Sequence, residues 1–163
     1  MIGYADVKSS PVYFYVQRNT SYSAMGSIMP FELTRLNIGG AMNTSSGIFT
    51  APRNGIYSFH FSCTTHHPAS LLGDVYVFIS LILNGNNIGR SETRSNDDDS
   101  YYTQSLHSTL ELKTGDEVWI SIAAIDGGAS LYDSSNHYTH FTGYFLQENV
   151  ASSLKSASSL QQQ

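Results

Sequence analysis

The chain has 163 residues, a length that suits one domain with a core large enough to fold without a metal or a disulfide. Charged residues form 13% of the sequence, the net charge is −5, and Lys and Arg together number only eight. Partners that attract clustered basic side chains are therefore not expected, which argues against nucleic acid and anionic membrane surfaces. The polarity comes instead from Ser, Thr and Asn, which favours strands and turns over helices.

Composition divides the chain into three regions. Residues 1–10 form an N-terminal arm that lacks the basic and apolar regions of a signal peptide. Residues 11–149 form one globular domain, and residues 150–163 form a Ser- and Gln-rich tail that we expect to be disordered. Cys63 is the only cysteine, which excludes an intrachain disulfide, and its apolar strand predicts burial. The longest apolar stretch, 75–83, is about half the length of a membrane-spanning helix, so no membrane insertion is expected.

In chain order, the domain predicts short β-strands almost throughout. Residues 11–17 are aromatic and β-branched and form the first of them. Residues 55–63 alternate strictly in polarity, and their apolar face is formed by Tyr57, Phe59, Phe61 and Cys63. Gly55 precedes this face at a turn, where we expect a positive φ.

The second half of the domain continues the pattern. Residues 75–83 are almost continuously apolar, which predicts a central strand covered on both faces. Asn84-Gly85 predicts a hairpin directly after it, and residues 105–112 alternate again with leucines on one face. Residues 118–124 and 139–146 supply the last strands. Eight to ten antiparallel strands with regularly spaced turns predict an all-β fold, either a sandwich or a jelly roll.

A set of spaced aromatic and glycine residues runs through these strands. It consists of Phe31, Asn37, Phe49, Gly55, Tyr57, Phe59 and Phe61, flanked by the segments 47–52 (GIFTAP), 83–85 (LNG), 115–119 (GDEVW) and 141–146 (FTGYFL). This pattern resembles the signature of the complement C1q globular-head family over most of residues 12–147. Met42 is the one departure, because the family has an aromatic residue or Leu there, and Met fills the same kind of core gap.

The resemblance implies a ten-stranded jelly-roll sandwich of the C1q and tumour-necrosis-factor type that assembles as a homotrimer. It also implies a secreted, extracellular protein. The chain has no Gly-X-Y repeat, so it resembles the stand-alone members without a collagen stalk. A mature or recombinant form would explain the lack of a signal peptide.

Two function classes stay open. The first, favoured by the low charge and the Tyr-rich loops, is a lectin-like or pattern-recognition protein that binds carbohydrate or microbial surface ligands in innate immunity. The alternative is a cytokine-like or matrix-interaction head that binds a protein receptor. Catalysis is not expected, because the sequence has no Gly-x-Ser-x-Gly elbow and no phosphate-binding loop in a strand–helix context. No cofactor is required by this interpretation.

The acidic run Asp97, Asp98 and Asp99 is the strongest local charge feature. Several oxygen ligands in a flexible loop suit calcium, and some C1q-like heads bind calcium in roughly this segment. One such family position falls near Arg94, which cannot be a ligand, so a solvated acidic loop is the alternative. Asn19 and Asn43 begin Asn-x-Ser triplets and are candidate glycosylation sites, although both triplets also suit ordinary polar loops.

Candidate ligand-binding residues lie mainly in the loop before the last strand. A sugar site needs amide and carboxylate groups for hydroxyls and an aromatic face for the C–H side of the ring. The loop offers Tyr132, Asp133, Asn136, His137 and Tyr138, and the strand after the acidic run adds Tyr101 and Tyr102. An ordinary polar loop is the alternative. His66 and His67 match no zinc spacing, and we expect them to be exposed loop histidines.

Overall fold

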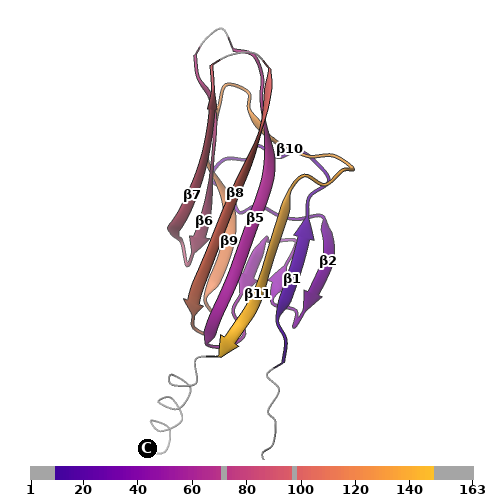
Figure 1. The fold of residues 1–163 in the computed structure, drawn as a ribbon, viewed down its shortest axis with the longest axis vertical. Helices are drawn as coiled ribbons and strands as arrows, with labels where there is room; N and C mark the ends of the chain where they lie inside the picture. Colours follow the sequence, from indigo (N-terminus) through magenta and orange to yellow (C-terminus); the bar gives the residue numbers. More distant parts are fainter. Residues whose placement is uncertain (1–9, 71–72, 97–98, 149–163) are drawn as a thin grey trace, which may run out of the picture.

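The computed structural model describes residues 10–70, 73–96 and 99–148, which form two antiparallel sheets packed face to face (Figure 1). The described residues contain eleven strands. Their bounds are β1 (Tyr13–Gln17), β2 (Leu33–Ile38), β3 (Met42–Asn43), β4 (Ile48–Thr50), β5 (Gly55–His67), β6 (Val75–Leu83), β7 (Asn86–Ser95), β8 (Ser100–Leu112), β9 (Glu117–Asp126), β10 (Ser130–Tyr132) and β11 (His140–Glu148). In this part of the chain no helix is long and apolar enough to span a membrane.

The larger sheet is built around β5. β8 pairs with β5 along its whole length, while β11 and β10 follow one another along its other edge. β1 and β2 extend the sheet beyond β11 (Figure 1). The smaller sheet has the order β3-β4-β9-β6-β7. This all-β jelly-roll architecture is the predicted fold; ten strands were expected and the described residues form eleven, three of which have only two or three residues.

Aromatic rings fill the space between the sheets. The alternation of β5 is confirmed, because Tyr57, Phe59 and Phe61 are buried. The Phe59 ring packs against Phe14 of β1 and Phe141 of β11 at centroid separations of 6.3 and 6.2 Å, and the Phe61 ring packs against Phe141 at 6.3 Å. Each buried ring contributes roughly 2–3 kcal/mol through the area that it removes from water. Cys63 is buried as predicted, and burial raises the pKa of its thiol.

Two glycines leave room for this aromatic core. A Cβ atom on Gly143 would lie 2.4 Å from the Phe14 ring and 2.8 Å from the Phe59 ring, so side-chain packing requires glycine there. At Gly55 the expectation of a positive φ is wrong. A Cβ atom there would instead lie 2.5 Å from both the Phe145 ring and the Gln147 carbonyl oxygen. Packing of β11 against β5, not backbone conformation, therefore requires glycine at Gly55.

The smaller sheet confirms one strand prediction and corrects another. The β6–β7 hairpin turns at Asn84 and Gly85, which have φ values of 50° and 83°, as an Asn-Gly turn requires. β6 is central, between β9 and β7, but it is not covered on both faces. Tyr76 and Phe78 point away from the core and are only half-buried. The Arg94 guanidinium lies over both rings, at 5.5 and 5.0 Å from their centroids.

The prediction that His66 and His67 are exposed loop residues is wrong. Both belong to β5, which continues four residues beyond Cys63 because β8 and β10 pair with it there. His67 is fully buried, and its ring nitrogens lie 3.1 Å from the Val75 carbonyl oxygen and 2.9 Å from the Thr93 hydroxyl. Because Val75 can only accept, Nδ1 carries the proton and Nε2 accepts. Burial lowers the pKa of His67 and favours this neutral form.

Candidate functional site

Three tyrosines from separate segments meet where β5, β8 and β10 end. Register places Tyr132 of β10 opposite Thr64 of β5, and Tyr101 of β8 opposite His66, two residues further along β5. The Tyr132 ring centroid lies 5.2 Å from that of Tyr101 and 5.4 Å from that of Tyr138. Thr64, Tyr101, Tyr132 and Tyr138 line an open hollow of about 340 Å³, here called the tyrosine pocket. β10 pairs with β5 in the upper part of Figure 1.

The walls of the pocket are accessible to solvent. Tyr101 is 54% exposed and Tyr138 is 37% exposed, which is unusual for such large rings. Tyr101 stacks on the His66 ring at 4.7 Å, and His66 Nε2 in turn contacts the Asp99 carboxylate. Sequence reasoning selected the three tyrosines but missed Thr64 and His66. The alternation of β5 could have placed both of them on one face, had the strand been continued past Cys63.

Asp133 organises the loop between β10 and β11. Its side chain is buried, and its carboxylate accepts hydrogen bonds from the backbone N–H groups of Ser134 (2.8 Å), Tyr138 (3.1 Å) and Thr139 (2.8 Å). Three such bonds compensate for the loss of water around the charge. The structure therefore places Asp133 beneath the pocket, as the group that holds the Tyr138 backbone in position.

The other predicted loop residues lie at the rim and behind it. Asn136 is exposed, and its Nδ2 donates a 3.2 Å hydrogen bond to the Tyr138 hydroxyl. His137 adopts a positive φ of 55°, and its Nδ1 donates to the Arg18 carbonyl oxygen at 3.1 Å. His137 thus ties the loop to the segment that follows β1. The Asn136 amide keeps unused hydrogen-bonding capacity beside the pocket.

Tyr102 does not join this group. Alternation along β8 turns it to the core side of the sheet, where its ring contacts the buried His67 ring edge-on at 5.0 Å. The sequence cannot separate Tyr101 from Tyr102 unless the register of the strand is known, because consecutive residues of a strand face opposite sides. The structure brings together Tyr101, Tyr132, Asn136 and Tyr138, and it separates Tyr102 from them.

The metal prediction falls partly outside the described structure. Asp97 and Asp98 are not among the described residues, and Asp99 is exposed with its carboxylate against His66. In residues 10–70, 73–96 and 99–148, no group of three or more His, Cys, Asp or Glu side chains could hold a metal ion. A calcium site at the acidic run therefore stays a prediction. Asn19 and Asn43 are both exposed, and glycosylation at either also stays a prediction.

The pocket combines aromatic faces with neutral polar groups. Its hydroxyl groups come from Thr64 and the tyrosines and its amide from Asn136. Asp99 and His66 lie beside it, and the hydrogen-bonded Asp133 carboxylate lies beneath it. Such a surface can stack on the C–H face of a small polar molecule and hydrogen-bond to its hydroxyls.

Comparison with known proteins identifies the family. A family model described as "C1q domain" matches residues 13–146, from the first residue of β1 into β11. The chain belongs to the C1q domain family. A solved structure, the globular domain of zebrafish complement 1qA protein, matches with a TM-score of 0.62 and covers 85% of this chain and 99% of that one. At 19% identity, that likeness shows the shared fold alone.

Longer proteins contain relatives of this C1q domain. Complement C1q tumor necrosis factor-related protein 3 of Mus musculus is 31% identical over 140 residues, which cover 84% of this chain and 52% of the relative. Caprin-2 of Danio rerio is 31% identical over 119 residues, covering 73% of this chain and 12% of the relative. The chain thus spans about half the length of the first relative and a small part of the second.

Proposed function

We propose that this C1q domain is an extracellular, homotrimeric recognition module that binds carbohydrate on microbial surfaces through the tyrosine pocket. The observation that carries the proposal is the convergence of Tyr101, Tyr132 and Tyr138 on one hollow beside the Asn136 amide. Sugars present apolar C–H faces and hydroxyl rims, and this pocket offers a partner for each. Membership of a family defined by a binding domain supports a binding role over a catalytic one.

Self-association is supported by the face of the larger sheet that points away from the core. This open face consists of outward-pointing side chains of β8, β5, β11, β1 and β2, and it includes the large residues Tyr13, Leu36, Ile38 and Tyr144. Each of those four is 40–44% exposed. A chain with a net charge of −5 repels its copies, so a face with few charged side chains and several exposed aromatic and aliphatic ones is where copies can meet. Three linked pockets would convert a weak site into avid binding.

A protein receptor is the second candidate function, and the outer face of the smaller sheet favours it. Arg90 and Arg94 lie over the rings of Phe78 and Tyr76, with separations of 5.0–6.0 Å. Arginine and aromatic side chains are the residues most enriched at the centres of protein interfaces. This surface is broad and lies away from the pocket, as a protein partner would need.

The test is an array of glycans and microbial polysaccharides probed with the purified protein, once with calcium and once with chelator. The pocket contains no metal ligands among its described residues, so we expect binding to a subset of polysaccharides that survives the chelator. Binding that disappears with chelator would transfer the site to Asp97, Asp98 and Asp99. A blank array under both conditions would contradict the proposal and favour the protein receptor.

A further inference from the structure

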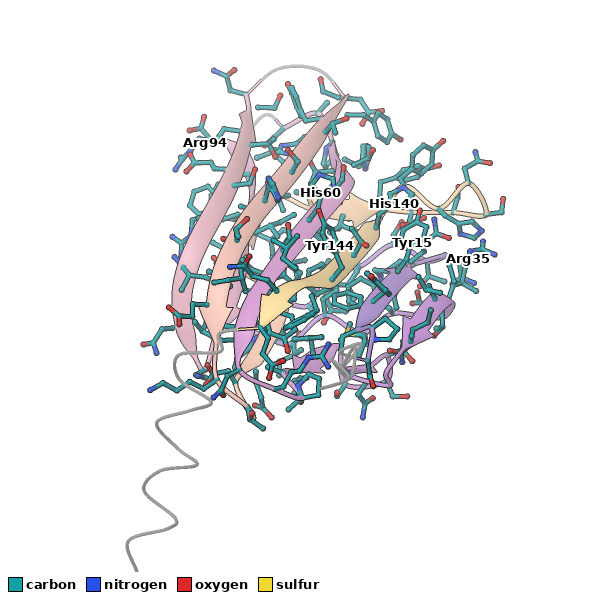
Figure 2. The ribbon with its side chains drawn as sticks, turned by 60° about the horizontal axis from the view of Figure 1, so that its bottom comes forward. Tyr15, Arg35, His60, Arg94, His140 and Tyr144 are labelled. Atoms are coloured by element: carbon teal, nitrogen blue, oxygen red, sulfur yellow. The ribbon has the colours of Figure 1, made fainter. Side chains whose placement is uncertain are left out.

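Three histidines lie close together in the middle of the open face that we propose as the self-association surface, and His66, further along β5, points to the same side. His60 of β5 is directly opposite His107 of β8, and His140 begins β11 one register step away, opposite Ser62 of β5. In the middle of the sheet, the side chains form two neighbouring rows that run across the strands. In the order β8, β5, β11, β1, β2, the first row is His107, His60, Thr142, Tyr15 and Leu36. In the same order, the second row is Ser105, Ser62, His140, Gln17 and Leu33. Neither row contains a carboxylate. Figure 2 shows His60, His140, Tyr15 and Tyr144 on adjacent strands of this sheet.

A hydrogen-bonded chain fixes the protonation state of His140. Arg35 Nε can only donate, and it donates a 2.6 Å bond to Gln17, so the Gln17 oxygen must face Arg35. The Gln17 NH₂ group then faces the other way and donates to His140 Nδ1 at 3.0 Å and to the Tyr15 hydroxyl at 3.0 Å. The Tyr15 hydroxyl also contacts Nδ1, at 2.7 Å. His140 Nδ1 is therefore an acceptor, and the ring is neutral.

A proton on His140 Nδ1 would break this chain. It would face the Gln17 NH₂ group at 3.0 Å, which cannot accept it, so the Gln17–His140 hydrogen bond would be lost and only the Tyr15 hydroxyl at 2.7 Å could accept. Gln17 cannot rotate its amide without turning NH₂ toward the Arg35 donor. The charged groups around the ring come from several elements: Arg35 of β2, His60 of β5, and Asp133 and His137 of the preceding loop. Burial lowers the pKa of His140, Asp133 raises it, and His137 and His60 lower it again.

The other two histidines add charge to the same surface. The His60 and His107 rings meet edge-on at 6.2 Å, and His107 Nε2 lies 3.2 Å from the Ser58 hydroxyl. If both rings are protonated, two like charges face one another across adjacent strands, which is unfavourable. Protonation of His60, His107 and His140 adds three positive charges per subunit to this face. The two rows that contain these histidines carry no carboxylate to compensate for them.

We propose that the trimer formed over the open face is an acid-sensitive assembly, held together while His60, His107 and His140 are neutral and released when they are protonated. This inference rests on the proposed self-association. Covering an imidazole with a second copy removes water and disfavours its charged form. The separated subunit then binds more protons than the trimer in acid, so the trimer weakens as the pH falls from neutral and is stable at neutral pH.

The consequence concerns ligand release. A trimer binds a repetitive surface through three pockets at once, whereas a free subunit has one pocket and low affinity. A ligand captured at neutral pH would therefore be released in an acidified compartment without any change in the pocket itself.

The experiment measures the mass of the protein in solution by light scattering after gel filtration, at pH 7.4 and at pH 5.0. We expect a trimer at pH 7.4 and folded single subunits at pH 5.0. The dissociation constant of the trimer should rise about tenfold for each unit by which assembly lowers the pKa of a histidine. The variant His60→Gln/His107→Gln/His140→Asn keeps polar groups but cannot titrate, and its trimer should persist at pH 5.0. His66→Gln is the matched control: it removes a histidine about 20 Å further along β5 and should dissociate like the wild type.

The outcomes separate this inference from the proposed function. A wild-type trimer that persists at pH 5.0 overturns the acid switch and leaves the trimeric module intact. A monomer at pH 7.4 overturns the self-association and this inference with it. Circular dichroism at pH 5.0 distinguishes release from unfolding, which the buried His67 would promote. If the aromatic circular dichroism signal disappears when the trimer dissociates, the subunits have unfolded and the acid switch is contradicted. A triple variant that dissociates like the wild type also contradicts the assignment of the switch to the three histidines.

Discussion

The side-chain amide of Gln17 determines which ring nitrogen of the neighbouring His140 carries a proton. An uncharged side chain between Arg35 and His140 sets which nitrogen of the imidazole can carry a proton, because the arginine leaves the amide one orientation. This relation could not be predicted from the sequence. The three residues are separated by 18 and 105 positions, and only the pairing of β1 with both β2 and β11 brings them together.

Replacing Gln17 with Glu tests that relation. The new carboxylate would contact both Arg35 and His140, and a nearby negative charge favours the imidazolium form. We expect the pKa of His140 to rise by about one unit or more, followed through its ring proton signals in an NMR pH titration. Gln147→Glu adds the same charge further along β11 and should leave the pKa of His140 unchanged. An unchanged pKa in Gln17→Glu would show that the hydrogen-bonded chain does not control protonation.

At the scale of the element, alternation in polarity predicted β5 and β8 because each has one face against the core, whereas β6 was predicted from its continuous apolar run. The last four residues of β5, Thr64 to His67, were not predicted as strand because they are polar. Pairing with β8 and β10 holds them in the strand. The buried polar cluster of His67, Thr65 and Thr93 compensates for placing those groups in the core. No local pattern shows that compensation.

Gly143 and Gly89 offer a matched pair of strand glycines, neither of which has a positive φ. Gly143→Ala forces a Cβ atom into the Phe14 ring, so we expect a loss of about 1–3 kcal/mol in the free energy of unfolding. At Gly89 the nearest atom to a new Cβ is 3.9 Å away, and Gly89→Ala should change stability by less than about 0.5 kcal/mol. Urea unfolding at one protein concentration measures both, and equal effects would contradict the packing account of β11.

At the scale of the whole molecule, the two faces of the larger sheet differ in their contacts: one packs in the core and the other is open. The inner face is closed by aromatic packing, and the open face carries tyrosines, histidines and neutral polar groups. The tyrosine pocket lies at the end of the sheet where β5, β8 and β10 meet. The sequence identified the residues of the pocket as two separate candidate segments. Their convergence depends on strand register, which a single sequence does not determine.

The most direct measurement compares polysaccharide binding by the wild type, Tyr101→Ala and Tyr76→Ala on the same array. Tyr101 is a pocket wall that is 54% exposed, so its loss should leave the fold intact and remove one stacking surface. Tyr76 is an equally large ring on the outer face of the smaller sheet. The account predicts at least about tenfold weaker binding for Tyr101→Ala, equivalent to about 1.4 kcal/mol, and unchanged binding for Tyr76→Ala. Full binding by Tyr101→Ala, or loss only in Tyr76→Ala, would contradict the assignment of recognition to the tyrosine pocket.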